Sequence, residues 1–115
     1  MQYMLLIYGE EAAWANMPPE KLSEEMGAFF AYTEALTKAD KYIAGDELQP
    51  VATAKTVSLL GGKHRVVDGP FAETKETLGG YYLIKAESMD EALRWAAKCP
   101  GARYGRIEVR PVMVR

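Results

Sequence analysis

The pattern of apolar and polar positions along the chain predicts strands and helices in a regular order. Residues 3–8 (YMLLIY) are almost all apolar, which is typical of a strand covered on both faces in the middle of a sheet. Residues 81–86 (YYLIKA) form a second largely apolar run and predict another central strand. Between residues 106 and 111, charged and apolar residues alternate, and Pro111 places this half-polar strand at or near a sheet edge.

Two segments carry apolar residues at helical spacing. The pair Pro18-Pro19 suits the first turn of a helix, and a stripe that we expect to be core continues to about Lys38 through Leu22, Met26, Phe29, Thr33 and Leu36. Ser88 and Glu91 form a capping-box pattern that predicts the start of a second helix. This helix carries Ala92, Leu93, Ala96 and Ala97 and ends at Pro100-Gly101.

A hairpin is predicted in the middle of the chain. Residues 41–50 read as a short extended piece and a turn, after which residues 56–60 and 63–67 flank Gly61-Gly62, a two-residue connection typical of a tight hairpin. With these glycines in the turn, the register is fixed, and it pairs Leu60 with Lys63, Leu59 with His64, Val57 with Val66, and Lys55 with Asp68. One face of the hairpin is therefore mostly apolar.

The order of elements predicts an α+β chain related to the split βαβ motif, with an antiparallel sheet and two helices on one face. Two helices cover only one face of such a sheet, whereas residues 3–8 are apolar toward both faces. A second copy of the chain is the simplest cover for the other face, so we expect a two-fold homodimer.

Composition limits the function classes. The chain of 115 residues is 49% hydrophobic, which fits a single domain over residues 1–115. Its net charge of −2 and scattered basic residues argue against binding to nucleic acid or anionic lipid. Cys99 is the only cysteine, and the N-terminal apolar run lacks signal-peptide features and is too short to span a membrane. We expect a soluble protein of the reducing cytoplasm.

The segment VVDGPFAETKETLGGYYLI, residues 66–84, resembles the signature of the DGPF family within the YCII-related proteins. The N-terminal YMLLIYGEEAAW and the C-terminal CPGARYGRIEVRPV are similar to that family as well. The resemblance implies a ferredoxin-like subunit that pairs as in the dimeric α+β barrel proteins. It also implies a partnership with an extracytoplasmic-function sigma factor.

The chain departs from the wider YCII group at one position of interest. In that group, a His–Asp pair is the proposed active site, and its histidine lies on the first helix. Here the first long helix has no histidine, and the only one in the chain is His64 in the hairpin. His64 and Asp68 lie four residues apart on one strand, roughly 13 Å, so they do not form a dyad within one subunit.

The candidate site residues gather around the DGPF segment, and each has two interpretations. Asp68, the candidate catalytic residue, is either an acid or base in a cleft or a structural group that caps the loop or pairs with Lys55. Gly69-Pro70 stiffens the loop, and Phe71 is expected to be buried as a plug in the core. The candidate ligand-binding residues are Tyr8, Glu73, Lys75 and Tyr81, with Glu76 beside them; the charged ones alternatively form a solvated face, and the tyrosines alternatively make core or dimer contacts.

Neither a metal nor a cofactor is expected. One cysteine and one histidine do not supply a structural zinc set, and the chain has no calcium-loop, phosphate-cradling or nucleophile-elbow motif. Two hypotheses remain. The first is a protein that binds a small organic ligand in a cleft beside the DGPF loop, with cofactor-free acid–base chemistry. The second is a non-catalytic regulatory module that works with a sigma factor.

Overall fold

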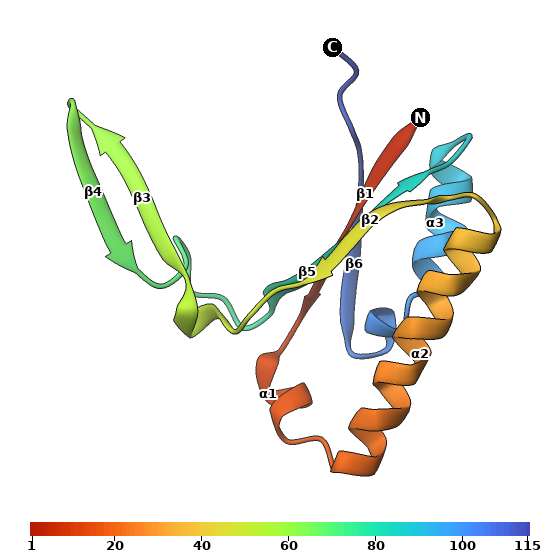
Figure 1. Cartoon of the computed structure of the whole chain (residues 1–115). Helices are drawn as coiled ribbons and strands as arrows, with labels where there is room; N and C mark the ends of the chain where they lie inside the picture. Colours follow the sequence, from red (N-terminus) through yellow and green to blue (C-terminus); the bar gives the residue numbers. More distant parts are fainter.

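The computed structural model describes all residues from Met1 to Arg115. The chain forms six strands and three α-helices, whose arrangement is drawn in Figure 1. The strands are β1 (Gln2–Gly9), β2 (Tyr42–Glu47), β3 (Lys55–Leu60), β4 (Lys63–Asp68), β5 (Thr77–Lys85) and β6 (Gly105–Pro111). The helices are α1 (Glu11–Ala15), α2 (Pro19–Lys38) and α3 (Met89–Lys98), with short 3-10 turns at Val51–Thr53 and Pro100–Arg103.

Four of the strands form one antiparallel sheet in the order β2-β5-β1-β6. The two apolar runs of the sequence, β1 and β5, are its central strands, and β6 with Pro111 is an edge strand, as predicted. This order, with α2 and α3 as the connecting helices, is that of a ferredoxin-like α+β subunit.

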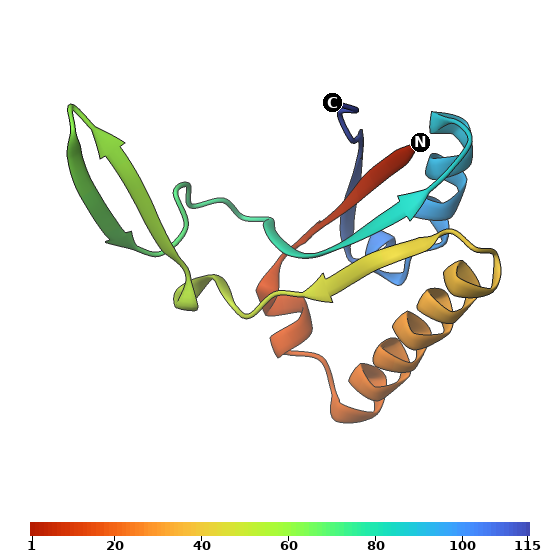
Figure 2. The same ribbon diagram turned by 45° about the horizontal axis from the view of Figure 1, so that its top comes forward.

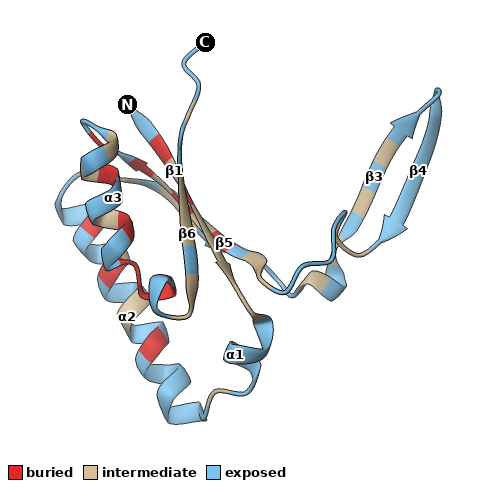
Figure 3. Ribbon diagram, turned by 180° about the vertical axis from the view of Figure 1, so that it is seen from behind, coloured by how far each residue is buried: buried red, intermediate tan, exposed pale blue.

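Both long helices lie on the same side of this sheet, and the core lies between the two layers (Figure 3). The core consists mainly of side chains from β1, β5, α2 and α3, namely Tyr3, Leu5, Tyr32, Leu36, Tyr82, Ile84, Ala86, Ala92, Ala96 and Cys99. The predicted stripe of α2 is wrong in its first half, because Leu22 and Met26 are exposed. Glu25 is buried instead, at helical spacing from Tyr32 and Leu36.

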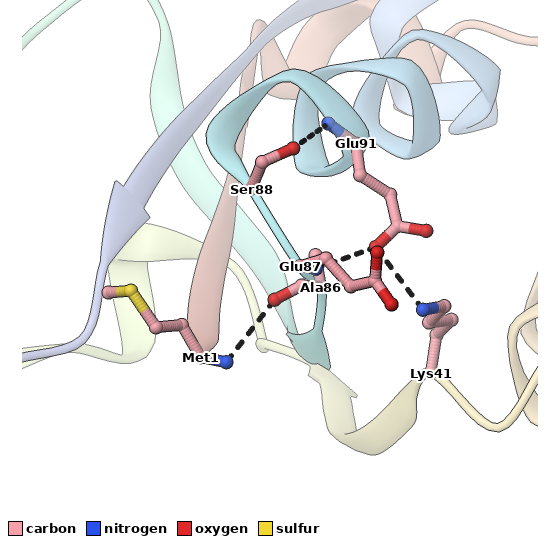
Figure 4. A network of polar contacts seen from close by, with 6 residues as sticks. All are labelled: Met1, Lys41, Ala86, Glu87, Ser88 and Glu91. Atoms are coloured by element: carbon pink, nitrogen blue, oxygen red, sulfur yellow. Dashed lines mark hydrogen bonds and ion pairs between the residues drawn. The ribbon is translucent and has the colours of Figure 1, made fainter.

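A polar network fixes the start of α3 (Figure 4). The Ser88 side chain accepts a hydrogen bond from the Glu91 N–H at 3.2 Å, which confirms the predicted cap. The Glu91 carboxylate accepts from the Glu87 N–H at 2.7 Å and pairs with the Lys41 ammonium at 3.2 Å. The Glu87 N–H and the Lys41 ammonium hold the pKa of Glu91 below its usual range.

The face of the sheet opposite the helices has no second layer. Because directly opposed residues of neighbouring strands share a face, the register assigns three cross-strand rows to it. From β6 through β1 to β5, these rows are Arg110–Met4–Leu83, Glu108–Leu6–Tyr81 and Arg106–Tyr8–Leu78. We call these nine residues the open sheet face; it is apolar along its central strands and charged along β6.

Strands β3 and β4 form a separate two-stranded sheet, the arm (residues 55–68), which projects away from the helices (Figure 2). All four predicted residue pairs of its register are confirmed. The turn glycines Gly61 and Gly62 have φ of 57° and 77°, which a residue with a Cβ adopts only with strain. The arm makes the subunit extended, with a radius of gyration of 16.1 Å, against about 13 Å for a compact domain of this size.

The predicted burial of Phe71 is wrong for the subunit, because its side chain is 91% exposed. The loop of residues 69–76 connects β4 of the arm to β5 of the main sheet and lies outside the layered body (Figures 1 and 2). No core lies beneath Phe71 for its ring to enter.

Candidate functional site

A hollow of about 520 Å³ lies at one end of the open sheet face. Its lining side chains come from three places in the sequence: Tyr8 of β1, Glu76 of the 69–76 loop, and Arg106, Ile107 and Glu108 of β6. Tyr8 and Arg106 are directly opposed in the β1–β6 register. The hollow therefore combines a phenol, a guanidinium and two carboxylates.

Ion pairs lie in the lining of this hollow and beside it. The Arg106 Nε lies 3.4 Å from the Glu76 carboxylate, which ties the end of the 69–76 loop to β6. Lys75, the preceding residue, has its ammonium 3.5 Å from the Glu10 carboxylate at the start of α1. Arg110 donates its Nε–H to Glu108 at 2.9 Å. Such largely exposed pairs contribute little to stability.

The structure separates the sequence-predicted site residues. Tyr8 lines the hollow, and Tyr81 lies on the same open sheet face in the next row. Lys75 pairs with Glu10 beside the hollow, whereas Glu73 is an exposed loop residue. The residues that sequence reasoning did not select are Arg106 and Glu108, although their alternation with apolar neighbours already indicated that they share one face of an edge strand.

Asp68 is not among the residues that line the hollow. Its carboxylate accepts a hydrogen bond from Lys55 at 2.5 Å, and its side chain is 86% exposed. The Thr56 hydroxyl donates to the Gly69 carbonyl at 2.7 Å, and the Gly69 N–H donates to the Ala54 carbonyl at 2.7 Å. Asp68 therefore belongs to a set of bonds that fixes the base of the arm.

Tyr81 makes a defined contact on the open sheet face. Its hydroxyl donates to the Asp46 carboxylate at 2.8 Å, and Asp46 is its neighbour in the β2–β5 register. This hydrogen bond, together with partial burial, raises the pKa of the Tyr81 phenol. Tyr81 is therefore a neutral hydrogen-bonding group near neutral pH.

A second polar cluster lies on the helix side of the sheet. Glu25 of α2 is the only buried acidic residue, and it binds Arg103 and lies 3.6 Å from the Lys21 ammonium. Beside it, Trp14 packs on Tyr104, with ring centroids 5.0 Å apart. Burial by itself would raise the pKa of Glu25, but hydrogen bonds from Arg103 and Tyr104 and the two cationic charges outweigh it and lower the pKa. Every buried polar side-chain atom has a partner, so this cluster is a satisfied structural pair.

The lowered pKa of Glu25 predicts a loss of stability in acid. Since the pKa is lower in the folded state than its ordinary value of 4.5, the stabilisation is fully present above about pH 4.5 and disappears as the pH falls through the folded-state pKa. We expect Glu25→Gln to flatten the decline of the melting temperature between about pH 6 and about pH 3. The matched control is Glu24→Gln, at the exposed neighbouring position; an equally flattened profile there would contradict the assignment.

No group of three or more histidine, cysteine, aspartate and glutamate side chains is placed to hold a metal ion. None of the helices combines the length and the apolar character needed to cross a bilayer.

Comparisons with known proteins place this fold and sequence in context. The model of the YCII-related domain matches residues 1–114. An uncharacterised protein from Rhizobium meliloti (strain 1021) is 37% identical over 123 aligned residues, covering 97% of this chain and 92% of the relative. Among solved structures, 5-chloro-2-hydroxyhydroquinone dehydrochlorinase from Burkholderia phenoliruptrix AC1100, in complex with 2,5-dihydroxybenzoquinone, is similar with a TM-score of 0.57 and 16% identity over 98% of this chain and 94% of that one. At this identity, the structural likeness concerns the fold.

Proposed function

The chain belongs to the YCII-related domain family, and from that premise we propose that it binds a small organic molecule in the hollow at the end of the open sheet face. The observation that carries the proposal is the convergence of Tyr8, Arg106, Glu76 and Glu108 around about 520 Å³ of open space. A concave site in which a few polar groups converge is a usual form of a ligand site.

The chemistry of the lining selects a class of ligand. The Arg106 guanidinium suits an acidic oxygen, which would compete with Glu76 for it. The Tyr8 phenol donates or accepts a hydrogen bond, and its aromatic ring offers an apolar contact. A small ring with ionised or hydroxyl oxygens suits both the guanidinium and the tyrosine. The dehydrochlorinase of similar fold holds such a molecule, 2,5-dihydroxybenzoquinone, which makes this compound a rational probe.

Within this proposal, Glu76 and Glu108 are the groups for acid–base chemistry without a cofactor, because both residues line the hollow. Of the residues selected from the sequence, Tyr8 binds the ligand, and Lys75 and Tyr81 support the hollow from its surroundings. Asp68 acts structurally through Lys55 at the base of the arm. Glu73 has no partner that ties it to the hollow.

A second copy of the chain is proposed to cover the open sheet face, as in the dimeric α+β barrels. Met4, Leu6 and Leu83 lie only partly buried in the middle of this face, and charged side chains lie along β6. An apolar centre with a charged margin is the usual anatomy of a protein interface. Cys99 is buried and unpaired, in agreement with the cytoplasmic location that we propose.

Binding of the probe tests the proposal. We expect saturable binding of 2,5-dihydroxybenzoquinone in calorimetric titration, and at least a tenfold loss of affinity in Arg106→Gln, because one good charged hydrogen bond contributes about 1.5–3 kcal/mol. Arg94→Gln on the exposed surface of α3 is the matched control and should bind like the wild type. Equal affinities of Arg106→Gln and the wild type would contradict the site.

One observation favours the second candidate function, a regulatory module that binds an extracytoplasmic-function sigma factor. Leu22, Met26 and Phe30 follow one another at i, i+4 and i+8 on α2 and are all exposed. Such a stripe fits docking against another protein. A measured affinity for a sigma factor that is lost in Phe30→Ser, in a protein that binds no small molecule, would favour this function over the first.

A further inference from the structure

The arm exposes apolar side chains that the subunit itself does not cover. Five of them are between 51% and 72% exposed: Val57, Leu59, Leu60, Val66 and Val67. Figure 3 shows no element of the body packed on either strand. An isolated two-stranded hairpin is marginally stable in water, so an arm of this composition requires a partner surface.

The register places three of these five apolar side chains on one face of the arm. Val57 and Val66 are directly opposed, and Leu59 lies on the same side next along β3. Phe71 follows just beyond the arm and is almost fully exposed. The three aliphatic side chains form a patch of the kind that marks an interaction surface, and Phe71 adds an exposed ring in the loop that follows.

The base of the arm is held in a defined conformation. Lys55 and Asp68 form an ion pair across it, and the Thr56 hydroxyl and the Ala54 carbonyl are hydrogen-bonded to the Gly69 backbone. Gly69 has φ of 95°, a conformation open to glycine and strained for other residues. These bonds join the two strands at the base of the arm and keep the hairpin closed there.

Charge indicates what kind of surface the arm meets. Lys55, Lys63, Arg65 and Asp68 give residues 55–68 a formal charge of +2, with His64 neutral. The whole chain carries −2, so the remainder of the subunit carries −4. A basic arm and an acidic body are complementary, and complementary potentials favour association and suppress wrong partners.

The position of the arm agrees with a second copy as that partner. The arm and the helices lie on opposite sides of the main sheet in Figures 1 and 2, so a molecule seated on the open sheet face would lie in the angle between sheet and arm. Two-fold symmetry then gives each subunit one arm to extend and one body to receive its counterpart.

We propose that the arms are exchanged in a homodimer, each lying on the other copy with Val57, Leu59, Val66 and Phe71 against it. The inference rests on the dimer in the proposed function. It adds that the arm is an intersubunit clasp, and it assigns the ring of Phe71 to the interface.

Photo-crosslinking tests the exchange. With p-benzoylphenylalanine in place of Leu59, an equal mixture of isotopically light and heavy protein is expected to give crosslinked pairs that contain one light and one heavy chain. The same group in place of Leu93, which is exposed on α3, is the control and should give none. Crosslinks within a single chain would overturn the proposal, because the arm would then lie on its own body.

Sedimentation of Val66→Asp separates the arm from the dimer itself. We expect the dissociation constant of the dimer to rise at least tenfold. The helical signal in circular dichroism should stay unchanged, because the arm contributes no residue to the core. A dimer of unchanged affinity would overturn the clasp and leave the proposed dimer intact. A wild-type protein that sediments as a monomer would overturn both.

Discussion

Replacement of Leu5 by alanine is expected to lower the free energy of unfolding by about 2–5 kcal/mol. Leu5 is fully inaccessible to solvent at the centre of β1, between Tyr82 and Val109 of the neighbouring strands and facing the helices. Its truncation removes buried apolar surface and leaves a cavity that the close-packed layers do not refill. Denaturant unfolding at one fixed protein concentration measures the change.

The matched control is the next residue of the same strand. Leu6 points to the open sheet face, so Leu6→Ala should cost a single subunit less than Leu5→Ala does. The comparison is made at low concentration, where association adds little to the apparent stability. Equal losses would mean that the two faces of β1 are equally covered within one subunit, contrary to the structure.

The second large effect is expected at Leu6 when a charge replaces it. Leu6 occupies the middle row of the open sheet face, between Tyr81 and Glu108. If a second copy covers this face, Leu6→Asp buries one unpaired carboxylate from each copy, which is strongly unfavourable. We expect a dimer in the wild type and a folded monomer of 12.8 kDa in the variant by analytical ultracentrifugation.

Val114→Asp, at an 80% exposed residue near the C-terminus, also replaces an aliphatic side chain by a carboxylate and is the control for added negative charge. It should leave the dimer unchanged. A wild-type dimer that survives Leu6→Asp would contradict the interface, and the open sheet face would then need another partner.

The strands of the main sheet could be predicted because each is marked by its own residues. The apolar runs of β1 and β5 indicated burial on both faces, and Pro111 indicated the edge position of β6. The register of the arm was predictable because the Gly61-Gly62 turn fixes which residues are opposed, and the pair of Lys55 with Asp68 follows from it. Each of these predictions depends on neighbouring residues alone.

The remainder depends on contacts between distant segments. Phe71 is exposed because the 69–76 loop passes outside the body, and nothing within that loop specifies its distance from the core. Glu25 is buried because the turn after α3 brings Arg103 to it from 78 residues away. The period of α2 does include Glu25, but a charged residue was not assigned to the core without its partner in view.

Only part of the candidate site could be predicted, because its residues meet through contacts between distant segments. Tyr8 was selected from the sequence, whereas Arg106 and Glu108 join it only through the register of β1 with β6. Asp68 was selected because it belongs to the DGPF motif. Of its two interpretations, the structural one is seen in the structure, where the carboxylate is paired with Lys55 at the base of the arm.

An NMR titration with 2,5-dihydroxybenzoquinone tests whether the hollow on the open sheet face is the ligand site. We expect saturable chemical-shift changes concentrated at Tyr8, Glu76, Arg106 and Glu108, and none at the buried cluster of Glu25 and Arg103. Shifts centred on Glu25 and Arg103, or no shifts at a saturating concentration of the quinone, would contradict the proposed site.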